Sequence, residues 1–458
     1  MSTQVNTEKL PMIEKIGYFF GDFGSQFCWS FIGSYLSVFY TDVVGIAPLA
    51  VTVIFLIARI WDAVNDPMMG AIAERTQSRW GRFRPYIGFG APFLAAASVI
   101  AFINPNFSES GKIAFALISY IAAGMLYTMV NIPYGAMMGV MTNNVEERNA
   151  LAAFRMAGMT VGMLAVNFFA MPLILKFSHS SNATGTGYTM TSLVFSIVGF
   201  ISFMIVFATS KEVVKPVKKD KVPLKDSIKS IVSSGPILKC FFLQFFLMCG
   251  MMGRVGVAVY YYSYVIKRVD LISIFMTLPQ ISGIIAIIIS PKLADKFGKK
   301  AVVAGANLFE AIALVWIYFI PSGNVGMLLV ALFIFGLGGM ASPLILSMLN
   351  DAIDLTEYKT GVRSDGAAYA TNGLASKAGS AVAGIGVSIM AAFGYVANQQ
   401  QTAEALAGIN FTVNLLPAIL FFLAFLVTLT WNVKDDQAAK IRAELDANRL
   451  ENHSSSEE

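Results

Sequence analysis

Charged residues are scarce in this chain of 458 residues, where Asp, Glu, Lys and Arg together make up only 13%. Soluble domains contain about 25% charged residues, so a soluble protein of this composition could not cover its surface with polar groups. Histidine is rarer still: the only two, His179 and His453, lie outside the apolar segments, which excludes a histidine proton relay there. The three cysteines, Cys28, Cys240 and Cys249, fall in apolar segments without metal-ligand spacing and are expected to be small core residues.

Sequence motifs of catalysis are missing as well. The chain has no nucleophile–base pair, no metal-ligand cluster and no glycine-rich nucleotide-binding loop with the required spacing. An enzyme and an ATP-driven pump are therefore disfavoured. Short alternating strands are absent, which argues against a membrane β-barrel. No cleavable signal peptide is expected, because the polar first residues lead directly into an apolar segment.

Hydrophobic residues, in contrast, make up 56% of the chain. A helix needs about 20 apolar residues to cross the hydrocarbon core of a bilayer, and only helices or closed barrels can do so. The sequence therefore predicts an all-α integral membrane protein. We count roughly twelve spans of this kind, at 16–42, 47–73, 85–105, 112–139, 151–177, 188–210, 237–266, 270–292, 299–321, 325–350, 366–396 and 406–432.

The positive charges predict the orientation of these spans. Lys and Arg crowd the connections after the second, sixth and eighth spans, whereas the opposite connections carry few, Lys267 and Arg268 being exceptions. Positive loops stay in the cytoplasm. Both termini are therefore predicted to be cytoplasmic.

A basic segment, 211–236, divides the spans into two sets of six. The sequence predicts an N-terminal bundle at 1–210, a cytoplasmic basic linker, a C-terminal bundle at 237–435 and a charged cytoplasmic tail at 436–458. A short internal repeat supports two related halves, because "ERTQSRWGRFRP" follows span two and "ADKFGKKAVV" follows span eight. Two pseudo-symmetric six-helix bundles with a site near the midplane are the plan of major facilitator transporters.

Three charges lie on one face of the second span. Arg59, Asp62 and Asp66 are spaced three and four residues apart, and Asn65 lies beside them. A charge at mid-membrane costs about 2.5–3.5 kcal/mol, so such a face must meet a wet cavity or partner groups. Two neighbouring carboxylates both stay ionised only beside a cation, which predicts a cation or proton site. The alternative is an internal salt bridge of Arg59 that only docks helices.

Other polar groups occur in later spans. Tyr127, Thr128 and Asn131 share a helix face, and Arg155 and Lys377 are single charges in long apolar segments. The connection after span ten is dense in charge, with Asp351, Asp354, Glu357 and Arg363. We expect these four residues to form gating salt bridges in a cytoplasmic loop, the alternative being a merely solvated loop.

Several motifs together resemble the glycoside–pentoside–hexuronide:cation symporter family of the major facilitator superfamily. They are "GDFGS", "FYTDVVG", "ARIWDAVNDPMMG", "SRWGRFRP", "YTMVNIPYG" and "DAIDLTEYKTGVRSDG", in the family's order and spacing. The resemblance extends from about residue 10 to 435. It implies a secondary active symporter in the plasma membrane, for a bacterium the inner membrane.

The resemblance also implies roles for single residues. The cation, Na⁺ if the protein is sodium-coupled, is expected at Asp62 and Asp66 with help from Asn65 and Thr128. The resemblance places Arg155, Asn372 and Lys377 at the sugar. With the residues of the other polar faces, the set expected to contact the sugar is Gln26, Arg59, Tyr127, Asn131, Arg155, Asn372 and Lys377.

Two positions depart from the galactoside carrier that typifies the family. Its Lys-Asp pair on span one is replaced by Ser25 and Gln26, and its sugar-binding aspartate and aromatic residue on span four are replaced by Asn131 and Gly135. The loss of acids makes the predicted site more cationic. This favours a glucuronide or other acidic sugar over a simple galactoside, with neutral pentosides left open.

The predicted function is uptake of a sugar or glycoside driven by Na⁺ or H⁺ entry, by alternating access. The expected partners are that sugar, the monovalent cation or proton, and the lipid bilayer; no cofactor and no nucleic acid are expected. The alternative is a sodium-coupled lysolipid carrier of related fold. The sequence leaves the sugar, the coupling ion and the oligomeric state open.

Overall fold

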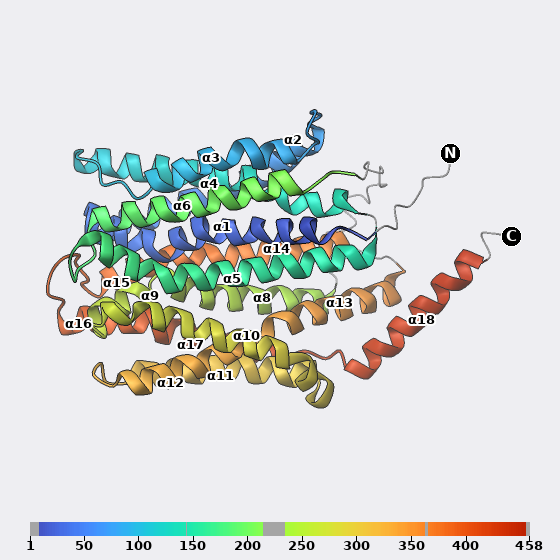
Figure 1. The fold of residues 1–458 in the computed structure, drawn as a ribbon. Coiled ribbons are helices and arrows are strands. Elements are labelled where there is room, and N and C mark those ends of the chain that lie inside the picture. The colour runs from blue at the N-terminus through green and yellow to red at the C-terminus, as the bar shows by residue number, and fades with distance from the viewer. Residues whose placement is uncertain (1–8, 143, 214–233, 362–364, 455–458) are drawn as a thin grey trace. The chain divides into compact units, whose positions relative to one another are not determined.

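The predicted spans fold as helices in the computed structural model, which describes residues 9–142, 144–213, 234–361 and 365–454 (Figure 1). All regular secondary structure in these ranges is helical. Several helices begin at a residue whose side chain accepts a hydrogen bond from the first turn: Ser108 binds the Gly111 N–H, and Asn144 binds those of Glu146 and Glu147. Such caps satisfy N–H groups that have no partner within the helix.

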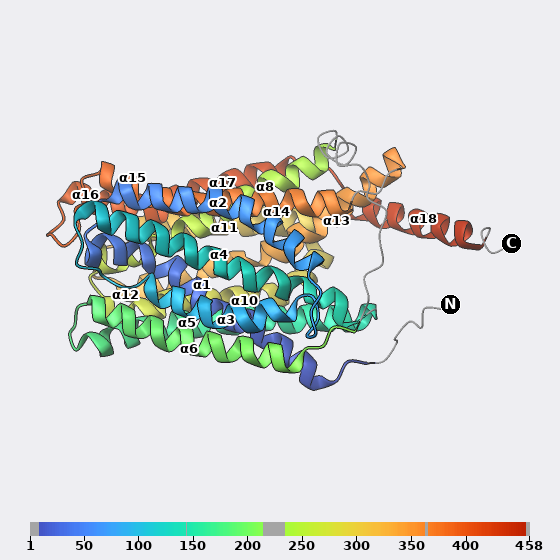
Figure 2. The same ribbon diagram turned by 90° about the horizontal axis from the view of Figure 1, so that it is seen from above.

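The first six spans correspond to six long helices. They are α1 (Met12–Val38), which continues into the π-helical turn η1 (Phe39–Val44), α2 (Pro48–Arg75), α3 (Arg84–Ile100), α4 (Glu109–Met141), α5 (Val145–Ser178) and α6 (Gly185–Thr209). Figure 2 shows α2 and α4 lengthwise beside each other, as their contacts confirm. This pairing brings the charged face of α2 against α4.

The last six spans are more broken. Their elements are α8 (Gly235–Val255), α9 (Ala258–Tyr260), η2 (Tyr261–Val265), η3 (Val269–Leu271), α10 (Ile272–Phe297), α11 (Lys299–Phe319), α12 (Val325–Gly336), η4 (Leu337–Met340), α13 (Ala341–Thr360), α14 (Asp365–Ala381), η5 (Val382–Gly384), α15 (Ile385–Ala392), α16 (Ala403–Asn410), η6 (Phe411–Leu415) and α17 (Leu416–Leu429). Counting helices continued through such short turns as one, ten in the described part of the chain are long and apolar enough to cross a membrane. The other two predicted spans are α1, which is more polar, and α3, whose 17 residues extend only about 26 Å.

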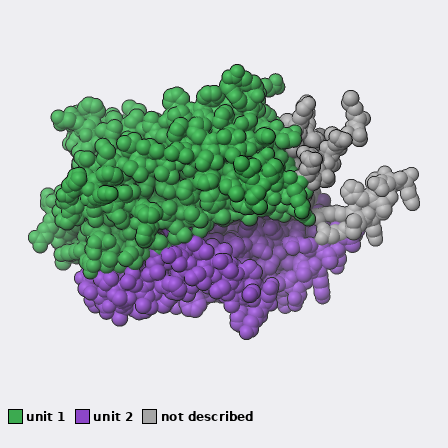
Figure 3. Space-filling model, in the orientation of Figure 1, with its two compact units in different colours: residues 1–218, 255–277, 384–409 green, residues 219–254, 278–383, 410–458 purple. Residues whose placement is uncertain are grey.

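The chain packs as two compact units (Figure 3). Unit 1 contains residues 1–218, 255–277 and 384–409, and unit 2 contains 219–254, 278–383 and 410–458. Unit 1 therefore holds the whole predicted N-terminal bundle and also two segments of the C-terminal one. Most of the predicted linker, 214–233, lies outside the described residues.

Glycines bring α5 and α6 close to α1. A Cβ atom added at Gly158 would lie 2.2 Å from the backbone oxygen of Phe19, and one at Gly162 would lie 2.7 Å from that of Phe23. Gly24 and Gly199 make a similar close contact between α1 and α6. Small residues four apart permit this backbone approach in membrane helices. The approach fixes the position of α5 side chains against α1.

The two halves share a capping device at the loops of the predicted repeat. In unit 1 the Glu212 carboxylate accepts hydrogen bonds of 2.7–3.0 Å from the backbone N–H groups of Arg82, Phe83 and Arg84, where α3 begins. In unit 2 the Asp435 carboxylate accepts one of 3.0 Å from Lys299, where α11 begins. Each cap follows the last span of its half.

A glycine with positive φ precedes each capped helix. Gly81 has φ of 108° and Gly298 has φ of 84°, and a Cβ at either position would collide with the capping carboxylate or crowd it. Only glycine adopts such a conformation without strain. The same turn chemistry therefore recurs in both halves.

Candidate functional site

The carboxylates of α2 face α4. Thr128 donates a hydrogen bond of 2.8 Å to Asp66, and a Cβ added to Gly124 would lie 3.1 Å from Oδ1 of Asp62. Gly124 and Thr128 are one helical turn apart, as are Asp62 and Asp66. Asp62 therefore faces Gly124, and Asp66 faces Thr128 one turn further along both helices. Both predicted cation-site acids therefore point into unit 1 toward α4.

Asn65 lies buried next to these acids, with 4% of its surface exposed. Its Nδ2 has no hydrogen-bond partner among the described residues. This atom is a hydrogen-bond donor, so it is not itself a ligand for a cation; only the amide oxygen of Asn65 could serve as one. Asn65 was predicted to assist the cation, and that role stays a prediction.

Arg59 pairs with Asp62 at 3.3 Å, which is the salt bridge that the sequence allowed as an alternative. The ion pair is not fully buried, because the side chains of Arg59 and Asp62 are 27% and 20% exposed. Arg59 also lies 5.5 Å from the ring centre of Trp29 on α1. The charged face of α2 thus meets α1 as well as α4.

A polar stripe follows α1. Asp22, Ser25, Gln26 and Trp29 are spaced three, four and seven residues from the first, so they share one face of the helix. Ser25 lies 3.1 Å from the hydroxyl of Tyr127, and Asn131 donates to Ser25 at 3.5 Å. The Trp29 ring stacks on Tyr127, with ring centres 4.5 Å apart.

Asp22 is a site residue that the sequence did not assign. Its carboxylate accepts a hydrogen bond of 2.6 Å from Nε of Arg155 on α5. The sequence contained a sign of its role, because a charged acid within an apolar segment is energetically costly in a bilayer. Asp22 also precedes Ser25 and Gln26 by three and four residues, which places it on their helix face. Gly135 leaves room for the Arg155 guanidinium, because a Cβ at position 135 would lie only 3.3 Å from Nη1 of Arg155.

The predicted sugar residues are thus divided between the units. Gln26, Arg59, Tyr127, Asn131 and Arg155 belong to unit 1. Trp29 and Ser25 link Arg59, Tyr127 and Asn131, while Arg155 contacts Asp22 on the same face of α1. Gln26 accepts a hydrogen bond from Ser30 and follows the stripe.

Asn372 and Lys377 belong to α14 of unit 2. The Asn372 backbone oxygen accepts from Ser376, whose hydroxyl accepts from Gln244, and Lys377 is exposed. Their role in binding sugar stays a prediction.

The predicted gating acids lie on a helix rather than in a loop, since α13 continues to Thr360. The loop prediction was wrong here because charge density was taken as a sign of irregular structure. Asp351 pairs with Lys299 of α11, and Asp351 and Asp354 pair with Arg442 at 3.6 and 3.1 Å. Arg442 lies on α18 (Asp435–Ser454), a helix in the predicted tail.

These ion pairs all lie within unit 2. Glu357 occupies the last turn of α13, and Arg363 lies outside the described residues. Gating by these residues therefore stays a prediction.

A second polar network lies at the far end of α1. The Asp42 carboxylate accepts hydrogen bonds from Tyr264, at 2.6 Å, and from Tyr395, and its backbone oxygen accepts one from Asn398. Thr41 lies 2.9 Å from the hydroxyl of Tyr260. These bonds attach both C-terminal segments of unit 1 to η1, the turn that continues α1.

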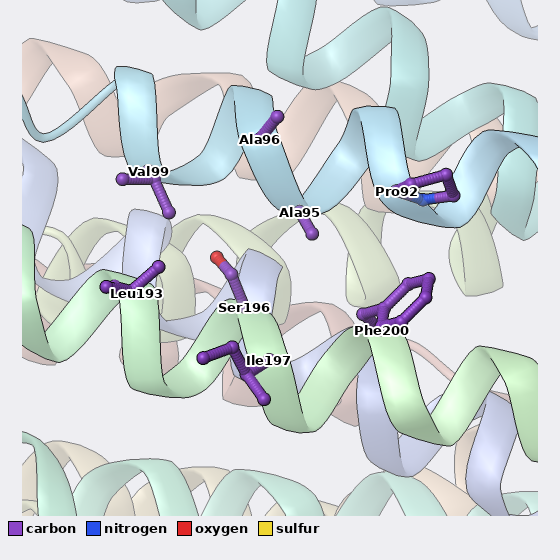
Figure 4. Close-up of a pocket in the computed structure, with 8 residues that line it drawn as sticks. All are labelled: Pro92, Ala95, Ala96, Val99, Leu193, Ser196, Ile197 and Phe200. Atoms are coloured by element: carbon purple, nitrogen blue, oxygen red, sulfur yellow. The ribbon is translucent and has the colours of Figure 1, made fainter.

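An apolar cavity of about 240 Å³ opens between α3 and α6 (Figure 4). Figure 4 shows Pro92, Phe200 and small aliphatic side chains around it, with the Ser196 hydroxyl as the one polar side-chain group. A sugar needs several hydrogen-bond partners, so this cavity is not the sugar site. In the described part of the chain no three His, Cys, Asp or Glu residues cluster as ligands for a metal ion.

Solved structures of transporters share the fold. A D-xylose-proton symporter aligns over 92% of this chain and 97% of its own with a TM-score of 0.64 and 15% identity, and a nucleoside transporter NupG mutant aligns over 91% and 99% with a TM-score of 0.66 and 12% identity. Identities this low show the fold alone. The protein is thus a multi-pass membrane protein of the major facilitator fold, as predicted.

The chain belongs to the MFS/sugar transport protein family, which matches residues 17–435. The "Uncharacterized symporter YnaJ" of Bacillus subtilis is 34% identical over 96% of both chains. The "Isoprimeverose transporter" of Lactiplantibacillus pentosus is 33% identical over 96% of this chain and 93% of its own, and the "Glucuronide carrier protein homolog" of Escherichia coli is 27% identical over 94% of both.

These similarities confirm the resemblance to glycoside–pentoside–hexuronide:cation symporters. The protein is a transporter of the bacterial inner membrane rather than an enzyme.

Proposed function

We propose that the protein is a symporter that couples the entry of one monovalent cation, Na⁺ or H⁺, to the uptake of a sugar or glycoside. The observation that carries the proposal is the pair of α2 carboxylates facing Gly124 and Thr128 of α4. Relatives named as symporters and as carriers of isoprimeverose and of a glucuronide support the substrate class.

The cation would bind between Asp62 and Asp66. Carboxylate, hydroxyl and amide oxygens are ligands that hard cations prefer, and Asp66, Thr128 and Asn65 supply all three kinds. A proton would serve the same electrostatic purpose by neutralising one acid of the pair. Either ion stabilises acids that are costly to hold inside a bilayer.

Coupling between cation binding and sugar binding then follows, because α2 and α4 carry residues of both predicted sites. Trp29 and Tyr127 link the cation side to the sugar side, because Arg59 lies over Trp29 and pairs with Asp62, while Tyr127 contacts Ser25 on the polar stripe. A cation that neutralises Asp62 changes the pairing of Arg59, and so changes the neighbouring aromatic pair. Sugar and cation therefore favour the same arrangement of unit 1.

The lysolipid alternative has less support. An amphipathic lipid requires a largely apolar site, whereas Asp22, Ser25, Asn131 and Arg155 form a polar cluster in unit 1. Such a cluster suits the hydroxyl groups of a sugar.

The test is uptake into proteoliposomes under an imposed Na⁺ or H⁺ gradient, with a panel of neutral and acidic glycosides. Asp62→Asn and Asp66→Asn are expected to abolish accumulation against a gradient while the variants still fold. Asp270→Asn, which changes an exposed surface acid, serves as the matched control. Accumulation by both α2 variants at the wild-type level would disprove the coupling site.

A further inference from the structure

Arg155 is already neutralised within unit 1. Its Nε donates at 2.6 Å to Asp22, whose side chain is 9% exposed, and its guanidinium also lies 5.1 Å from the ring centre of Tyr134. The sequence favoured an acidic sugar because acids seemed to be missing around this arginine. The structure supplies the missing acid from α1.

Backbone packing fixes this pair in place. Arg155, Gly158 and Gly162 share one face of α5, and the two glycines contact the backbone of Phe19 and Phe23 on α1. The Tyr18 and Tyr134 hydroxyls each donate to the other's backbone oxygen, at 2.9 and 2.7 Å, which ties α1 to α4. A ligand therefore meets the ion pair as a preformed group.

The charged side chains around the Asp22–Arg155 and Arg59–Asp62 pairs are nearly balanced. Asp22, Asp62 and Asp66 supply three negative charges at membrane depth, and Arg59 and Arg155 supply two positive ones. One bound monovalent cation brings the sum to zero. A neutral sugar leaves the sum at zero, whereas a sugar acid adds a negative charge that these residues do not compensate.

The pair also has the right chemistry for hydroxyl groups. A sugar hydroxyl is both donor and acceptor, and Asp22 offers an acceptor beside the donors of Arg155. Ser25 shares a face of α1 with Asp22, three residues before it, and Asn131 donates to Ser25, so both add further partners. A sugar carboxylate, in contrast, would compete with Asp22 for the guanidinium and leave a buried acid unpaired.

We propose that Asp22 is a sugar-binding residue which, by pairing with Arg155, selects neutral glycosides over sugar acids. The inference depends on the proposed function, since it names the substrate class of the same site. It replaces the expectation of an acidic sugar with that of a neutral one.

The test uses three ligands that differ at one position of the ring: methyl β-xyloside, methyl β-glucoside and methyl β-glucuronide. Binding and cation-driven uptake are measured for the wild type, Asp22→Asn and Arg155→Gln. The wild type is expected to prefer the xyloside or the glucoside over the glucuronide by at least about tenfold. Asp22→Asn is expected to weaken neutral-glycoside binding about tenfold or more and to strengthen glucuronide binding, because the guanidinium is released.

Arg155→Gln separates this role from simple structural damage. It is expected to lose neutral-glycoside binding without gaining the glucuronide, while thermal unfolding shows that both variants fold. A wild type that prefers the glucuronide, with or without dependence on Lys377, would overturn the inference, as would an unchanged selectivity ratio in Asp22→Asn. Failure of the proposed function gives a different result, because then no cation gradient drives uptake of any glycoside by the wild type.

Discussion

The Asp42 network provides the sharpest test of alternating access. Its carboxylate accepts hydrogen bonds from Tyr264 and Tyr395, which hold both C-terminal segments of unit 1 on η1. Hydrogen bonds to a charged acceptor contribute about 1.5–3 kcal/mol each, and neutral ones about 1 kcal/mol. Asp42→Asn should thus weaken the closure of this end by about 2–3 kcal/mol, or roughly 30- to 150-fold in the open population.

The assay is labelling of a single cysteine by an impermeant maleimide, in a variant without the three native cysteines. The reagent is added outside the cell, the side that the predicted orientation assigns to this end. Ala258 is fully buried beside the network, so Ala258→Cys reports opening of this end. When closing is fast, the labelling rate follows the open population. Asp270→Asn, which alters an exposed acid at 59% exposure, should leave the rate unchanged. A rate for Asp42→Asn within twofold of the parent would refute the reasoning.

Two further predictions concern the scaffold. Gly158→Ala should lower the free energy of unfolding by about 1–3 kcal/mol, because the added Cβ meets the Phe19 backbone oxygen, whereas Gly139→Ala, at an open position, should be neutral or stabilising in thermal unfolding. An equal effect of the two would contradict the close α1–α5 contact. Glu212→Gln should destabilise by about 1 kcal/mol, since it removes a negative charge from the N-terminus of α3. Hydrogen exchange of the first α3 amides should rise in this variant, and unchanged protection there would count against the cap.

Long-range architecture was predictable because the bilayer constrains it strongly. A run of apolar residues long enough to cross the hydrocarbon has few alternatives to a helix. The major facilitator fold was therefore confirmed, and ten of the twelve predicted spans are, in the described part of the chain, helices long and apolar enough to cross a membrane. The face that carries Asp62 and Asp66 followed from helical spacing alone. What lies opposite that face did not, because Gly124 and Thr128 are some 60 residues away in sequence.

Pairings between helices account for the remaining differences. Asp22 stands in a motif that the sequence singled out, but its partner Arg155 is 133 residues away, so the ion pair between them was not predicted. Asp351 and Asp354 were identified as gating candidates, yet Lys299 and Arg442 come from other helices, one of them in a segment predicted as a mere tail. Spacing along one helix predicts which side chains share a face and not which groups they meet.

The carboxylate caps have a consequence for how the polypeptide can be divided. Glu212 and the α3 start that it binds both precede residue 214, and Asp435 and the α11 start that it binds both follow residue 233. A break in the peptide chain between those two positions therefore leaves each acid on the same fragment as its own amide donors. If the two halves were synthesised as separate polypeptides, each would keep its own carboxylate cap. In each half, that cap joins the start of the third span to the residues that follow the sixth.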